Sequence, residues 1–191
     1  MPKIVDHEER RTSIATAAAG LIAEAGIEAV TMKRIGARAG GTTGAVTHYF
    51  RDKDELVLAA LLLVDNSMQR RFTAALEMAE TPIEALVAAL PNDVASRRDW
   101  RVWSVFSDYA TRSESLLAHY RASCVAWLDA AIELVADRYG RTHADARLDA
   151  EILIAVVESI GDAASVDPDS WPAERQRQLL QHCFNRIGDL P

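Results

Sequence analysis

One feature limits the fold of this chain more than any other: no glycine or proline occurs between Gly44 and Pro82. Helix-forming residues fill this interval, and no part of it alternates apolar and polar residues with the period of a strand. Asp52-Lys53-Asp54-Glu55, at its beginning, has the Asp-x-x-Glu form of a capping box. The pattern predicts one long helix from about residue 53 to residue 80, which stiffly connects an N-terminal module to a larger body.

Shorter helices are predicted on both sides of the long one, because capping residues mark their starts and glycine or proline marks most of their ends. Three precede it, over residues 6 to 26, 31 to 39 and 42 to 49. Five follow it, starting at Thr81, Asp99, Ser113, Thr142 and Pro172. We therefore expect an all-α fold of about nine helices, with an N-terminal domain of residues 1–52 and a second domain of residues 53–191.

Composition excludes several classes of protein. Hydrophobic residues make up 49% of the chain and charged residues 26%, as in an ordinary globular domain. The two cysteines, Cys124 and Cys183, are too few for a disulfide framework or a metal site, and we expect no metal or other cofactor. The N-terminus lacks the apolar region of a signal peptide, and the longest apolar run, residues 57–64, is too short to cross a bilayer. We expect a soluble, cytoplasmic protein without membrane contact.

Charge is unevenly distributed along the chain. The net charge is -7, yet residues 31–53 carry five basic side chains and a single acid, Asp52. A local excess of positive charge can contact phosphates, while an acidic remainder keeps the molecule in solution. A solvated surface would explain the same charge, so charge alone does not decide the function.

Residues 31–50 have the pattern of two short helices that meet at a tight turn. One set of side chains can pack inward: Ile35, Ala39, Val46 and Phe50. The outward set combines amines, hydroxyls and an imidazole, which suit hydrogen bonds to phosphate oxygens and base edges: Lys33, Arg34, Thr42, Thr43, Thr47, His48 and Tyr49. Gly44 and Ala45 are small enough to let the second helix approach the floor of a major groove. The segment is interpreted as a helix-turn-helix.

Residues 10–62 resemble the DNA-binding domain of the TetR family of bacterial regulators. The resemblance rests on residues 11–18, residues 21–26, Thr31-Met32 with Ile35, Ala39-Gly40, and above all residues 44–50 followed by Lys53-Asp54-Glu55-Leu56. It implies a homodimeric regulator that binds a palindromic DNA operator, most often a repressor released by a small-molecule effector. The hydroxyl residue Thr47 directly precedes His48-Tyr49-Phe50. This pattern resembles that of the branch of the family that includes choline-responsive regulators of betaine synthesis.

The resemblance also implies roles for individual residues. Base contacts are expected from Lys33 and Thr43, and phosphate contacts from Thr42, His48, Tyr49 and Lys53, with Gly44 and Thr47 on the same face. Two positions depart from the family pattern. Gly41 stands where a small branched apolar residue is usual, and Thr47 stands where many members have tyrosine.

Two apolar stripes near the C-terminus are candidates for a dimer interface: Ile152, Val156 and Ile160 on one helix, and Leu180, Phe184 and Ile187 on the next. Each stripe would serve equally well in the core of its own subunit. The resemblance favours pairing of these two helices with their symmetry mates. A twofold dimer would read half-sites about 34–36 Å apart.

A ligand site is predicted among the aromatic residues between positions 100 and 127. Trp103, Ser107, Tyr120 and Trp127 are the candidates to line a cavity, although a packed core needs the same residue types. An aromatic cage here, with Asp108 or Glu158 supplying the charge, would suit a cationic ligand.

Two other classes of function are less well supported. An enzyme is not expected, because the chain has no Gly-x-Ser-x-Gly elbow, no phosphate-binding loop and no clustered histidines. A helical protein-interaction module without specific DNA binding is the alternative, and a non-basic outward surface on residues 31–53 would favour it.

Overall fold

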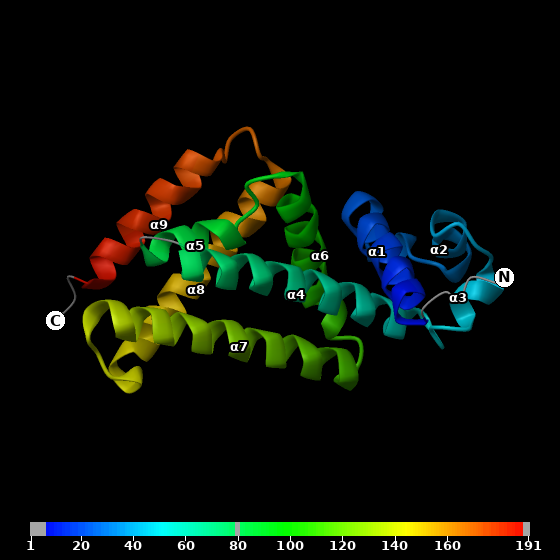
Figure 1. The fold of residues 1–191 in the computed structure, drawn as a ribbon, viewed down its shortest axis with the longest axis horizontal. Coiled ribbons are helices and arrows are strands. Elements are labelled where there is room, and N and C mark those ends of the chain that lie inside the picture. The colour runs from blue at the N-terminus through cyan, green and yellow to red at the C-terminus, as the bar shows by residue number, and fades with distance from the viewer. Residues whose placement is uncertain (1–6, 79–80, 189–191) are drawn as a thin grey trace.

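The computed structural model describes residues 7–78 and 81–188, and these form nine α-helices and one short 3-10 helix without any strand (Figure 1). The all-α prediction is confirmed. The helices are α1 (His7–Ala25), α2 (Met32–Arg38), α3 (Thr43–Thr47), α4 (Lys53–Met78), α5 (Pro82–Ala89), α6 (Val94–Ala110), α7 (Glu114–Tyr139), α8 (His143–Val166) and α9 (Ala173–Gly188), with η1 at Ile27–Ala29.

Capping residues start the helices largely where the sequence places them. The hydroxyl oxygens of Thr31, Thr42 and Thr142 accept hydrogen bonds from backbone N–H groups in the first turns of α2, α3 and α8. The predicted cap at Asp6 lies outside the described residues. The start predicted at Asp99 is wrong: α6 begins five residues earlier, at Val94, where Asp93 and Ser96 form a reciprocal capping box. A capping box with serine in place of glutamate at its fourth position was not recognised.

Helix α4 extends from the α1–α3 module deep into the body (Figure 1). It packs against α1 at its beginning and against α5, α6 and α7 further along. Its buried apolar side chains follow the helical period: Leu56, Val57, Ala60, Leu61, Val64, Met68 and Phe72. The domain boundary between residues 52 and 53 stays a prediction, because α4 belongs to both cores and α1 also contacts α6.

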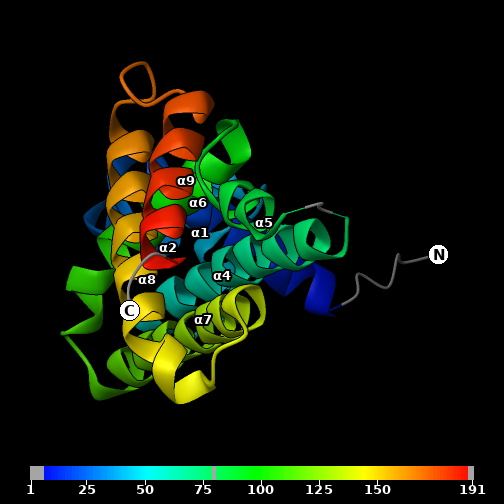
Figure 2. The same cartoon turned by 90° about the vertical axis from the view of Figure 1, so that its left-hand side faces the viewer.

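Helices α8 and α9 lie side by side at one side of the body (Figure 2). Four of the six residues predicted for the dimer interface point into the core of the subunit instead. Ile160, Leu180, Phe184 and Ile187 are each at most 3% exposed, and they pack between α8, α9 and their neighbours. Their assignment to a dimer surface is wrong, because each helix has two apolar edges and the periodicity does not say which edge faces inward.

Candidate DNA-reading and ligand sites

The turn between α2 and α3 is tight because two glycines allow close backbone approach. Gly40 has a φ of 68°, in the left-handed region that disfavours other residues. A Cβ at Gly36 would lie 2.8 Å from the carbonyl carbon and oxygen of Thr42, so only glycine fits there. The Gly41 N–H donates to the Gly36 carbonyl at 2.8 Å. The importance of Gly36 was not predicted, since nothing local distinguishes it from an ordinary helical glycine.

Packing of this module agrees with the predicted inward set. Ile35, Val46 and Phe50 are buried and Ala39 is half-buried. The predicted DNA-facing residues remain available on the other side. Lys33, Thr42, Thr43, Gly44, Thr47 and His48 are exposed, and Tyr49 is half-buried. These residues belong to α2, to α3 and to the segments that border α3. The hydroxyls of Thr42 and Thr47 are hydrogen-bonded to the backbone at Ala45 and Gly44, although both residues are exposed.

Lys53 differs from the other predicted DNA contacts, because it already has partners. Its Nζ lies 3.3 Å from a carboxylate oxygen of Glu28 and 5.6 Å from the centre of the Tyr109 ring. Arg112 approaches the same Glu28 carboxylate at 2.9 Å. The hydrogen bond from Lys53, with the positive charges of Lys53 and Arg112, lowers the pKa of Glu28. A phosphate would have to compete with Glu28 for this lysine.

The same junction contains a second link between the module and the body. The Tyr109 hydroxyl, at the end of α6, donates to Asp54 at the beginning of α4 over 2.7 Å. Burial, followed by this contact with the Asp54 carboxylate, raises the pKa of Tyr109 well above its ordinary value. The end of α6 is thus attached to both η1 and α4.

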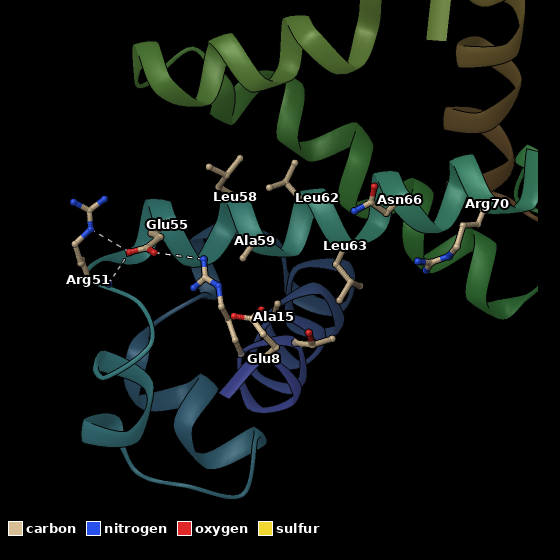
Figure 3. Close-up of a pocket in the computed structure, with 12 residues that line it drawn as sticks. Glu8, Ala15, Arg51, Glu55, Leu58, Ala59, Leu62, Leu63, Asn66 and Arg70 are labelled. Atoms are coloured by element: carbon tan, nitrogen blue, oxygen red, sulfur yellow. Dashed lines mark hydrogen bonds and ion pairs between the residues drawn. The ribbon is translucent and has the colours of Figure 1, made fainter. Parts of the chain in front are cut away.

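A cleft of about 590 Å³ lies between α1 and α4 and opens to solvent (Figure 3). Arg51 and Glu55 lie at one end, and Asn66 and Arg70 at the other, with Leu58 to Leu63 between them. Arg11 spans the cleft, donating to the Tyr49 carbonyl at 3.0 Å and to Glu55 at 3.5 Å. These bonds anchor α1 to the beginning of α4. Arg11 and Glu55 are thus engaged in this attachment, and Arg51 is paired with Glu55 as well.

A smaller, largely apolar cavity of about 50 Å³ lies inside the body, among α4, the end of α5, α6, α7 and α8. Three tryptophans and one carboxylate distinguish its lining: Met68, Ala89, Trp100, Trp103, Cys124, Trp127, Ile154, Val157 and Glu158. No lysine, arginine or histidine is among these residues. Burial, with the nearby Asp162 charge, raises the pKa of Glu158, and burial raises that of the Cys124 thiol.

Two of the four predicted ligand residues, Trp103 and Trp127, line this cavity. Tyr120 lies behind it, with its ring 5.5 Å from that of Trp103, and burial raises its pKa to about 12. Ser107 does not line this cavity: it is exposed, and its hydroxyl donates to the Ser104 carbonyl. Of the two acids proposed to supply the charge, Glu158 lines the cavity, whereas Asp108 is exposed and lies outside the lining. Trp100 lines it as well, and the sequence did not single it out because its helix meets the others only in the folded protein.

Asp65 reinforces the wall of this cavity. It is only 6% exposed, and its carboxylate accepts hydrogen bonds from the Trp127 indole and the Ser123 hydroxyl, both at 2.9 Å, and from Gln69 at 3.1 Å. All three donors are neutral. The carboxylate therefore adds negative potential behind an aromatic wall, and it orients Trp127.

An all-helical chain with an exposed helix-turn-helix and a separate helical body is the architecture of a DNA-binding regulator. Family comparison makes this class specific. Residues 14–60 match the model of bacterial regulatory proteins of the tetR family, and residues 80–188 match that of the C-terminal domain of BetI-type transcriptional repressors. The chain belongs to the TetR family of helix-turn-helix transcriptional regulators, and it is not an enzyme.

Individual relatives agree with this assignment. The chain is 30% identical over 194 residues to the HTH-type transcriptional regulator PksA of Bacillus subtilis, covering 95% of this chain and 92% of that protein. It is 31% identical over 122 residues to the regulator BetI of Rhizobium meliloti, a match that spans 61% of this chain and 59% of BetI.

Solved structures share the fold. A transcriptional regulator from Rhodococcus sp. Rha1 superposes with a TM-score of 0.82 at 27% identity, over 98% of this chain and 100% of that one. A regulator from Saccharomonospora viridis, solved in complex with choline, superposes with a TM-score of 0.81 at 22% identity, over 93% and 96% of the two chains. Within residues 7–78 and 81–188, no helix is long and apolar enough to span a membrane.

Proposed function

We propose that this protein is a homodimeric repressor that reads a palindromic operator with α3 and is released by a small organic cation bound in the tryptophan cavity. The DNA-reading part is supported by the exposure of Lys33 on α2, Thr43 on α3 and His48 at the end of α3. In this proposal Lys33 and Thr43 contact bases, while Thr42, His48, Tyr49 and, after release from Glu28, Lys53 contact phosphates.

The cation is supported by the cavity lining. Aromatic faces attract cations, and the Glu158 carboxylate and the buried Asp65 behind Trp127 add negative charge without a nearby basic side chain in the lining. The choline bound by the Saccharomonospora viridis regulator is a ligand of this chemistry. A cavity of about 50 Å³ is far below the roughly 300–1,000 Å³ of ordinary ligand pockets, so the walls must move apart on binding.

Movement of the walls would reach the DNA-binding module through α6. Trp100 and Trp103 belong to α6, whose end holds Asp54 through Tyr109. Displacing α6 would disturb these contacts and the pairing of Arg112 with Glu28, and it would change the separation of the two recognition helices. The effector then shifts the population toward a state with low operator affinity.

Selection of genomic DNA fragments by the purified protein, at two salt concentrations, tests operator reading. We expect a palindrome whose affinity falls steeply with salt. Lys33→Ala and Thr43→Ala should each cost roughly 1–3 kcal/mol and alter base preference at one position of each half-site. Recovery of no motif, or equal binding by both variants, would favour the protein-interaction alternative.

Titration of small quaternary ammonium ions, choline among them, tests the effector separately. A bound cation should quench tryptophan fluorescence and lower operator affinity, and Arg112→Ala should weaken the coupling between the two. Operator affinity that stays constant at saturating cation would contradict the inducible part of the proposal while leaving DNA reading intact.

The dimer is proposed through the outer surface of α8 and the adjacent edge of α9. Ile152 is 42% exposed and Val156 half-buried, and Leu148 and Leu179 are exposed nearby. Ile152→Glu should place a charge in the interface and raise the dimer dissociation constant by at least about tenfold. Sedimentation velocity measures this, with Val125→Glu on exposed α7 as the control; an unchanged dimer would exclude this surface.

A further inference from the structure

The absence of a side chain at Gly41 leaves a space that Arg10 fills. Gly41 is exposed, and its φ is not among the positive values found at Gly40 and two other glycines, so its backbone conformation does not demand glycine. A Cβ at this position would lie 2.9 Å from Nη2 of Arg10 and 3.5 Å from the Cβ of Ala45. The guanidinium of Arg10, in α1, therefore lies beside the turn that leads into α3.

Arg10 is not compensated by an acidic partner in the part of the chain that the structure describes, residues 7–78 and 81–188. Nearby arginines are occupied: Arg11 binds Glu55 and the Tyr49 carbonyl, and Arg38 binds Glu24 through both of its terminal nitrogens. Of these three, Arg10 alone has a guanidinium that is free to accept an external anion.

The turn of α1 that precedes Arg10 also borders α3. His7 lies three residues before Arg10, so the two side chains share one side of α1. The His7 ring is 4.6 Å from that of Tyr49 and 6.1 Å from that of His48. His7 thus meets the end of α3 and Arg10 meets its beginning, which places this side of α1 along the DNA-reading surface.

We propose that Arg10 is an additional DNA contact, which binds a backbone phosphate of the operator, and that Gly41 is the residue that makes room for it. A guanidinium suits phosphate because its planar fork donates two parallel hydrogen bonds. Such a contact adds affinity without reading sequence. The proposal rests on DNA binding through α3, but it concerns a residue outside the helix-turn-helix.

Fluorescence anisotropy with an operator duplex and an unrelated duplex, each over a range of KCl concentrations, tests the contact. Arg10→Ala should weaken binding to both duplexes by roughly five- to tenfold, and the salt dependence should lose about 0.9 of its log–log slope. Arg10→Lys should retain the slope. Arg121→Ala, an equal charge change on exposed α7, should change neither quantity. An unchanged slope in Arg10→Ala, or a loss confined to the operator, would overturn the phosphate contact.

Gly41→Ala tests the second half of the proposal. The atom it meets is the free end of a flexible side chain, so the fold should survive, and thermal melting verifies this. Operator affinity should fall about as far as in Arg10→Ala, and the double variant should bind no more weakly than Arg10→Ala alone. Fully additive losses would show that Gly41 acts independently of Arg10. Wild-type protein that binds no operator would instead refute the proposed function.

Discussion

The recognition surface and the tryptophan cavity differ in what must happen before each can act. Lys33 on α2 and Thr43 on α3 are already exposed, and a turn whose backbone segments are in contact at Gly36 holds the two helices together. The cavity encloses only about 50 Å³, so in the proposed function its walls would have to move apart before a ligand could enter. The recognition surface is thus preformed, whereas the proposed ligand site would have to open. In that proposal the free energy of ligand binding is used to displace α6, which connects the cavity to the DNA-binding module.

The largest expected effect tests the preformed site. Gly36→Ala would place a Cβ 2.8 Å from the carbonyl group of Thr42. A backbone carbonyl cannot relieve this clash by a change of rotamer, as a side chain can. We expect a loss of unfolding free energy of about 2–3 kcal/mol and loss of specific operator binding, since α3 must be displaced. Urea unfolding and anisotropy measure both. Gly44→Ala is the stability control, because its Cβ would meet nothing nearer than the Thr42 hydroxyl at 3.8 Å; equal stability of the two variants would contradict the argument.

The corresponding glycine-to-alanine substitution in the body, Gly161→Ala, should lower the unfolding free energy less than Gly36→Ala does. It should change cation affinity rather than operator binding. A Cβ at Gly161, on α8, would overlap the Trp100 ring, which lines the cavity. Because a side chain can shift where a backbone cannot, we expect Gly161→Ala to lower the unfolding free energy by about 1–2 kcal/mol. Cation affinity should change while operator affinity without ligand is kept. Ser159→Ala, on the exposed side of α8, is the control; a Gly161→Ala protein more stable than wild type would disprove the clash.

The smallest effect concerns Glu158 and depends on pH. Its pKa is raised in the folded protein, so the ionised carboxylate destabilises the fold at neutral pH, and this cost disappears as pH falls through the raised value. Glu158→Gln should therefore raise stability at pH 7 by less than about 1 kcal/mol, because the half-buried group keeps part of its hydration.

Cation binding should favour the ionised form of Glu158, whereas the stability of the fold favours the protonated form. It needs the ionised Glu158, so affinity should weaken on acidification above the ordinary carboxyl range, and Glu158→Gln should remove that pH dependence. Asp108→Asn, on an exposed residue outside the cavity, should leave the dependence intact. Isothermal titration over a pH series measures this, and a pH profile unaffected by Glu158→Gln would exclude the carboxylate from the site.

Local chemistry explains which parts of the fold were predictable. A capping residue, a proline or a glycine acts within one turn of its own position, so the starts of α2, α3, α4 and α8 could be inferred from neighbouring residues alone. The start of α6 was missed because its capping box uses Ser96 rather than an acidic residue. The residues of the recognition segment are also close in sequence, and the structure places nearly all of them as expected.

The sequence by itself therefore determined the helical class, the long connecting helix and the polar surface of the recognition segment, because each depends on interactions over a few residues. Tertiary structure alone decided that Ile160 and Phe184 lie in the core, that Trp100 and Glu158 share a cavity, and that Arg10 fills the space at Gly41. Helical periodicity defines which residues share a side of a helix. Which neighbour that side meets depends on packing among all helices at once, and no local pattern records it.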